Sequence, residues 1–115
     1  MEYLNKIELR GNIGTLRVQN VNGRSVANFS LATTRVFRNS SGEPVMDTTW
    51  HNVNVWEGKD VDDLKSLKKG DKVYVCGRLN MRRFTGSDGT ERTSYEVTAG
   101  VMRIIDDPTP FAYEA

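Results

Sequence analysis

Apolar and polar residues alternate along most of this chain, and this period of two limits the fold more than any other feature. The alternation covers about residues 6–16, 25–37, 47–57, 73–84 and 93–105. Successive side chains of a strand point to opposite faces, so each run predicts a strand with one apolar face. Asn22-Gly23, between the first two runs, is typical of a tight hairpin turn.

One segment, between the third and fourth runs, has a different period. Val61, Leu64 and Leu67 repeat every three residues, which predicts one side of a short helix. Asp60 is its expected N-cap, and Gly70 is expected to end it. Three strands, one helix and two strands is the order of a five-stranded Greek-key OB-fold barrel, whose known ligands include oligonucleotides and oligosaccharides.

The length of 115 residues fits a single domain. We assign residues 1–105 to the all-β OB-fold barrel and residues 106–115 to a short acidic tail that contains prolines. Three of the 15 acidic residues lie in the tail and none of the 16 basic ones, so the barrel carries an excess of positive charge. That excess fits either an anionic partner or an ordinary mixed-charge surface.

Cysteine content and hydropathy narrow the class of protein further. Cys76 is the single cysteine, so an internal disulfide is excluded and a reducing compartment is favoured. No stretch approaches the roughly 20 apolar residues of a membrane helix. The first residues do not resemble a signal peptide. We therefore expect a cytoplasmic protein with no membrane partner.

The third strand carries aromatic residues on the face that should point outward. Val53 and Val55 share the inward face, which puts Trp50 and Trp56 on the other face with Asn52 and Asn54. Tryptophan is usually well buried, so an exposed pair requires a reason. Exposed rings stack on the bases of single strands with little sequence preference, whereas a duplex hides its base faces.

Basic residues accompany aromatic ones elsewhere in the chain. The fourth strand is expected to place Phe84 on the same face as Arg78 and Arg82, with Arg83 next to it, and Phe37 lies between Arg35 and Arg38 near a hairpin tip. These features predict a non-catalytic protein that binds single-stranded nucleic acid by stacking and by contacts to phosphates. The alternative is an OB-fold interaction module whose aromatic residues serve a subunit or partner interface. Stacking and phosphate contacts do not distinguish DNA from RNA.

Short segments in a fixed order over residues 4–105 resemble the bacterial single-stranded DNA-binding protein family, usually called SSB. The segments are Asn5-Lys6 through Gly11-Asn12, Val26–Thr33, Thr49-Trp50-His51, Leu67–Gly70, Val73–Val75 with Gly77–Leu79, and Asp88-Gly89 followed by Tyr95-Glu96. The resemblance implies an OB-fold that assembles as a homotetramer. It also implies a nucleoid-associated protein that binds single-stranded DNA in replication, recombination and repair.

The resemblance also implies roles for individual residues. The family's DNA-stacking aromatics fall on Phe37, Trp50, Trp56 and Phe84. Two of these positions are commonly tryptophan in the family, so the smaller rings of Phe37 and Phe84 are expected to stack more weakly. His51 falls near a subunit contact. The basic side chains expected to contact phosphates or bases are Arg35, Arg38, Arg78, Arg82, Arg83, Lys6 and Arg10.

The tail departs from the family pattern. Members usually carry a long flexible linker that ends in an acidic tip with Pro-Phe, and this tip recruits replication and repair proteins. Here Asp106–Phe111 only echoes the tip, and no linker precedes it. The tail either recruits such partners or is an ordinary chain terminus, and the missing linker favours the terminus.

The chain has few residues of the types that usually act in catalysis. His51 is the single histidine, and nothing in the strand pattern brings it to Cys76 as a nucleophile–base pair. Zinc sites built from several histidines or cysteines are therefore not expected. Residues 11–14 lack the lysine of a phosphate-binding loop and fit a bend in a strand better. We expect no enzyme activity, no cofactor and no metal site.

Overall fold

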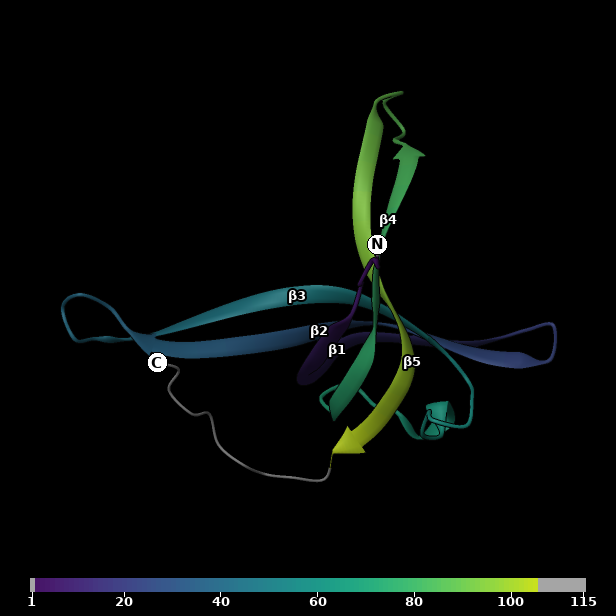
Figure 1. Cartoon of the computed structure of the whole chain (residues 1–115), viewed down its shortest axis with the longest axis horizontal. Coiled ribbons are helices and arrows are strands. Elements are labelled where there is room, and N and C mark those ends of the chain that lie inside the picture. The colour runs from purple at the N-terminus through teal and green to yellow at the C-terminus, as the bar shows by residue number, and fades with distance from the viewer. Residues whose placement is uncertain (1, 106–115) are drawn as a thin grey trace.

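The computed structural model describes residues 2–105, which form a β-barrel with one short 3₁₀ helix (Figure 1). Its elements are β1 (Ile7–Val21), β2 (Arg24–Arg38), β3 (Pro44–Trp56), η1 (Leu64–Ser66), β4 (Lys72–Thr85) and β5 (Glu91–Ile105). The acidic tail expected over residues 106–115 lies outside the described residues.

The strands close into a barrel in the order β1-β2-β3-β5-β4. Neighbouring strands run antiparallel, except that Val53–Val55 of β3 pairs in parallel with Val97–Ala99 of β5. β1 completes the barrel because its first half pairs with β4 and its second half with β2. This architecture confirms the predicted five-stranded OB-fold.

The inward faces of the five strands supply most of the core. The predicted rows on β2 and β3 are buried, so the alternation was interpreted correctly there. On β4 the predicted row is buried at Val73 and Val75 but exposed at Leu79 and Met81. The core cluster consists of Ile13, Ala27, Phe29, Leu31, Val53, Val55, Leu64, Leu67, Val73, Val75, Val97, Ala99 and Met102. Leu64 and Leu67 come from the connection between β3 and β4, which therefore covers one end of the barrel.

The β2–β3 and β4–β5 hairpins continue beyond the barrel as two-stranded arms, which leave it in different directions in Figure 1. We call residues 33–49 the β2–β3 arm and residues 79–96 the β4–β5 arm. A β-bulge at Gly77 marks the point where β4 begins to leave the barrel. A Cβ on Gly77 would collide with the carbonyl oxygen of Thr98, so this close approach of two strands requires glycine.

The short helix lies between β3 and β4 as predicted, but it begins later than expected. It is a single 3₁₀ turn whose N-cap is Asp63, and the Asp63 side chain accepts a hydrogen bond from the backbone N–H of Lys65. The prediction of Asp60 as the cap was therefore wrong. Asp60 instead pairs with Arg103 of β5 at 3.7 Å, a contact between residues far apart in the sequence.

The hairpin turn predicted from Asn22-Gly23 is present between β1 and β2. Both residues have positive φ angles, 52° for Asn22 and 82° for Gly23. Asparagine and glycine adopt this backbone conformation more readily than other residues, which explains why they occupy the turn. Over residues 2–105, the structure has no helix with the length and apolar character needed to cross a membrane.

Candidate nucleic-acid interface

Both tryptophans lie on the outer face of β3, as the alternation predicted. The Trp50 residue is 60% exposed and the Trp56 residue 36% exposed, whereas Val53 and Val55 are buried on the inner face. β3 pairs with β2 without a bulge from Val26–Trp56 to the hairpin tip, so the alternation is uninterrupted. The two indole rings are therefore presented by one strand face of a rigid barrel.

The Trp50 ring lies in a shallow seat made of small residues. Ala32 of β2 is directly opposite Trp50. The distal edge of the indole lies over Gly14 of β1, where a Cβ would be 2.5 Å from Cζ3 and 2.8 Å from Cη2. A bulge in β1 takes the Thr15 N–H out of the regular hydrogen bonding between β1 and β2. Next to Gly14, this N–H donates a hydrogen bond of 2.8 Å to the Ser30 hydroxyl instead. The absence of a side chain at position 14 thus gives the ring its place.

Trp56 has different surroundings. The Arg24 guanidinium lies 5.3 Å from the centre of its ring, a cation–π contact. Arg24 also donates a hydrogen bond of 3.2 Å to the carbonyl oxygen of Glu57. Val26, directly opposite Trp56, is buried although it belongs to the outer face. Arg24 was missed by the sequence reasoning because its contact with Trp56 depends on the pairing of β2 with β3.

Polar residues fill the outer face between the two tryptophans. Asn52 and Asn54 continue the row of Trp50 and Trp56 on β3, and Asn28 of β2 is opposite Asn54. One row crosses all five strands and has an arginine at each end; it consists of Arg17, Asn28, Asn54, Thr98 and Arg78. We call Asn28, Asn52 and Asn54 the amide cluster. Arg17 was not predicted either, since its position beside Asn28 follows from strand register alone.

The β4–β5 arm extends this polar face away from the barrel. Arg78 at its base, Arg82 and Phe84 share one face, as predicted, while Arg83 lies on the opposite face. The Arg78 Nε–H donates to the Asn80 Oδ1 at 3.3 Å. Arg82 lies 3.9 Å from the Glu96 carboxylate, a loose pair that leaves Arg82 largely exposed. Phe84, Arg78 and Arg82 are therefore brought together, and Arg83 is not.

The β2–β3 arm separates residues that the prediction had grouped. Phe37 and Arg35 have the parity of the core residue Leu31, so they lie on the opposite face of the arm from Trp50, whereas Arg38 shares the Trp50 face. The Arg35 guanidinium lies 4.3 Å from the centre of the Phe37 ring, which covers part of that ring. Arg35 is also 3.9 Å from the carboxylate of Asp47.

The remaining predicted residues lie elsewhere. Lys6 is exposed just before β1, and Arg10 lies on the outer side of the β1–β4 seam, opposite Tyr74. Tyr74 donates a hydrogen bond of 2.6 Å to the carboxylate of Glu8, which raises the pKa of the phenol to about 12. Neither Lys6 nor Arg10 joins the row between the tryptophans.

His51 lies at the mouth of the barrel with the inward parity of β3. Its Nε2 is 2.8 Å from the Thr33 hydroxyl oxygen, and partial burial lowers the pKa of the imidazole from its ordinary value. Its position near a subunit contact stays a prediction.

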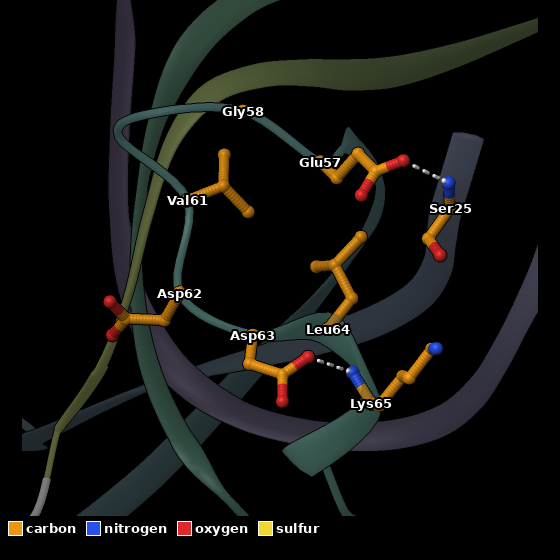
Figure 2. A pocket seen from close by; sticks show the side chains of 8 residues that line it. All are labelled: Ser25, Glu57, Gly58, Val61, Asp62, Asp63, Leu64 and Lys65. Carbon is orange, nitrogen blue, oxygen red and sulfur yellow. Dashed lines mark hydrogen bonds between the residues drawn. The ribbon is translucent and has the colours of Figure 1, made fainter. Parts of the chain in front are cut away.

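An acidic pocket of about 550 Å³ lies beside the connection between β3 and η1 (Figure 2). Its carboxylates are engaged in local bonds. Glu57 accepts from the Ser25 N–H, and Asp63 accepts from the N–H of Lys65. Asp62 points away from the pocket in Figure 2 and accepts from the Ile104 N–H, which lowers the pKa of its carboxyl group. Within residues 2–105, no three acidic, histidine or cysteine side chains are placed to hold a metal ion.

Comparison with known proteins gives the family of this fold. The model of the single-strand binding protein family matches residues 4–105. The chain belongs to the single-strand binding protein family. Among curated members, it is 38% identical to the single-stranded DNA-binding protein of Neisseria meningitidis over 106 residues, which is 89% of this chain and 60% of that protein. It is 37% identical to single-stranded DNA-binding protein 1 of Chlorobaculum tepidum, covering 89% of this chain and 65% of that one. The chain thus spans less than two thirds of the length of these relatives.

Solved structures of this family share the fold. The chain is similar to the Plasmodium falciparum SSB in its complex with ssDNA, with a TM-score of 0.78, 32% identity and coverage of 92% of this chain and 98% of that one. The single-stranded DNA binding protein of Thermus aquaticus is similar in fold, with a TM-score of 0.69 at 22% identity, over 91% of this chain and 52% of that one. The family recognised from the short segments of the sequence is therefore confirmed.

Proposed function

We propose that this chain binds single-stranded DNA with little dependence on base sequence, without catalysing a reaction, and protects it during replication, recombination and repair. The observation that carries the proposal is the outer face of β3, where Trp50 and Trp56 point away from the core beside arginines of neighbouring strands. The names of the curated relatives and the ssDNA complex of the Plasmodium falciparum SSB support it.

Stacking and charge each contribute to this activity. Stacking of one base on an aromatic side chain contributes about 1–3 kcal/mol, and any base can supply the ring face. Arginines on both sides of the tryptophan row are placed to neutralise phosphates. If about five do so, the logarithm of affinity falls with the logarithm of salt concentration at a slope of roughly −3 to −4 per chain. Duplex DNA offers the phosphates but not the ring faces, so the face selects single strands.

Titration of the full chain with oligo-dT, followed by tryptophan fluorescence, tests the proposal. We expect quenching at low salt, weaker binding as salt rises, and much weaker binding of a duplex of equal length. Trp50→Ala should lose affinity while the mass of the assembly is unchanged. Absence of quenching at low salt would refute the proposal, and so would equal affinity for the duplex. The same titration with oligo-rU measures whether RNA also binds.

We also propose that the chain assembles as a homotetramer, and His51 remains the predicted contact residue. Leu79, Met81 and Tyr95 on the second face of the β4–β5 arm are 43%, 51% and 57% exposed. Apolar patches of this kind usually mark an interface. Light scattering at micromolar concentration should report four copies, and a monomer would contradict the proposal.

An OB-fold module that mainly binds protein is the second candidate, because Trp56 is the less exposed of the two tryptophans and is covered by Arg24. Trp56→Ala separates the two functions. Loss of DNA affinity at unchanged mass supports stacking, whereas loss of assembly with DNA binding intact supports an interface. We further propose that the protein acts in the cytoplasm, associated with the nucleoid. Residues 106–115 lie outside the described residues, so the two alternatives for the tail, recruitment of replication or repair proteins and an ordinary terminus, stay predictions.

A further inference from the structure

The amide cluster has hydrogen-bonding groups that the fold itself does not use. Within residues 2–105, the structure shows no hydrogen bond from the side-chain amides of Asn28 and Asn52, and the Oδ1 of Asn54 is buried without a partner. Buried polar atoms are nearly always hydrogen-bonded, so an orphan acceptor in a native surface requires an explanation. The amides of Asn28 and Asn52 reach the surface, so they are free to bond a partner from outside the chain.

A pocket of about 260 Å³ lies beside Asn28 and Asn52 of this cluster, whereas Asn54 does not line it. It is lined by Thr15, Asn28, Phe29, Asn52, Val53 and Glu96. Phe29 and Val53 are core residues, so the pocket lies against the packed wall of the barrel. Small-molecule sites usually measure roughly 300–1,000 Å³, so this pocket suits a single planar ring rather than a whole nucleotide.

The charge of the pocket excludes a phosphate group. Glu96 is the one ionisable residue among those that line it, and its carboxylate repels an anion. Arg82 lies 3.9 Å from the Glu96 carboxylate but does not line the pocket, and Arg17 and Arg78 lie at the two ends of the row that crosses the five strands. The arrangement therefore suits a neutral group with hydrogen-bond donors and acceptors in the pocket and phosphates beside the arginines.

We propose that this pocket receives the Watson–Crick edge of one unpaired nucleobase, held by the side-chain amide of Asn52 and assisted by Asn28. This inference rests on the proposed function, because it assumes that the outer face binds single-stranded DNA. An asparagine amide has a donor and an acceptor side by side. Each of the four bases has an adjacent donor and acceptor on its Watson–Crick edge, so rotation of the amide serves them all.

This contact adds a second reason, besides stacking, for the preference for single strands. The pocket requires a base but does not choose among the four, which is compatible with sequence-independent binding. In a duplex the Watson–Crick edges are already paired, so the pocket admits only unpaired bases. Asn52 is two residues from Trp50, about 7 Å along the strand. One base can therefore stack on Trp50 while its neighbour enters the pocket.

A thymine isostere tests the inference. Two short oligonucleotides are compared, oligo-dT and the same length of 2,4-difluorotoluene nucleotides, which keep the shape of thymine but lack its hydrogen-bonding edge. We expect the full chain to bind oligo-dT about three- to tenfold more tightly, the size of one or two net hydrogen bonds. Asn52→Ala should remove this preference and Asn28→Ala should reduce it. Asn12→Ala removes an amide that bonds Gly70 outside the pocket and should keep the preference.

The outcomes distinguish the inference from the function on which it rests. If the wild-type chain quenches with neither oligonucleotide, the proposed function fails and the inference with it. If both oligonucleotides quench and bind equally, the function stands and the inference is overturned. The inference is also overturned if Asn52→Ala and Asn28→Ala both keep the wild-type preference. Unfolding midpoints of the variants show whether the fold is intact; Asn52 is exposed, so we expect little change.

Discussion

Gly14→Ala offers the sharpest test of how the outer face holds its more exposed tryptophan. The added Cβ would lie 2.5 Å from Cζ3 and 2.8 Å from Cη2 of Trp50. Carbon atoms in contact are about 3.5–4.0 Å apart, so the ring has to move by about 1 Å or more. Gly14 has no positive φ, so the backbone itself tolerates alanine. The conflict is therefore confined to two side chains, the Trp50 ring and the Ser30 hydroxyl, whose Oγ would lie 2.8 Å from the Cβ.

The size of the effect follows from the exposure of the ring. Trp50 is 60% exposed, so the indole can swing into solvent and the fold loses little stability. The loss appears instead in DNA affinity, because the displaced ring no longer presents its face beside the amide cluster. Stacking contributes about 1–3 kcal/mol per base, which corresponds to roughly a fivefold to hundredfold loss of affinity. Trp50→Ala sets the upper limit of this loss.

A double-mutant cycle decides whether Gly14 acts through Trp50. Affinity for a short oligo-dT is measured by fluorescence or anisotropy for wild type, Gly14→Ala, Trp50→Ala and the double variant. If the glycine acts through the ring, Gly14→Ala costs nothing further once Trp50 is absent. Gly100→Ala is the matched control, because a Cβ there meets no atom within 4 Å. An equal loss in the Trp50→Ala background, or no loss in the single variant, would refute the reasoning.

Three further predictions concern the groups around this face and at the ends of the barrel. Arg24→Ala removes the cation 5.3 Å from the Trp56 ring, so acrylamide should quench Trp56 more efficiently, with about 0.5–1 kcal/mol lost in urea unfolding. Partial burial holds the pKa of His51 in the folded state below its ordinary value, so the unfolded state binds the proton more readily. The free energy of unfolding should therefore fall as the pH is lowered from the ordinary pKa of histidine through the lowered pKa of His51. In a plot of urea midpoint against pH, His51→Gln should make the curve flatter over this range. Glu8→Gln removes the carboxylate that holds the Tyr74 hydroxyl, so ultraviolet titration should show the pKa of Tyr74 fall from about 12.

The sequence was sufficient to predict which side chains face outward where the alternation along one strand decides this. Alternation along β3 placed Trp50 and Trp56 outside because no bulge interrupts its pairing with β2. Alternation also separates Phe37 from Trp50, but grouping aromatic residues by their basic neighbours in the sequence concealed this. Arg83 was grouped in the same way and lies opposite Phe84.

Contacts between strands could not be obtained from alternation alone. Arg24 reaches Trp56, and Arg17 lies beside Asn28, because of pairing registers that no single run of residues reveals. The seat of Trp50 on Gly14 spans three strands. The helix cap was misplaced for the same reason, since Asp60 is held by Arg103 and leaves Asp63 to begin the turn. Residues that modify a site from a neighbouring strand are thus the ones that sequence reasoning missed.

The two faces of the β4–β5 arm suit two different occupants. The bulge at Gly77 carries β4 out of the barrel, so the row that is buried at Val75 becomes exposed at Leu79 and Met81. An arm that exposes this apolar row is unfavourable for an isolated chain, because water remains on side chains that continue the core. The opposite face carries Arg82 and Phe84 and extends the polar surface between the tryptophans. A second copy on the apolar row and a nucleic acid on the polar face therefore do not compete. DNA binding should survive a Met81→Glu substitution that dissociates the assembly, with a weaker affinity because fewer chains hold one strand.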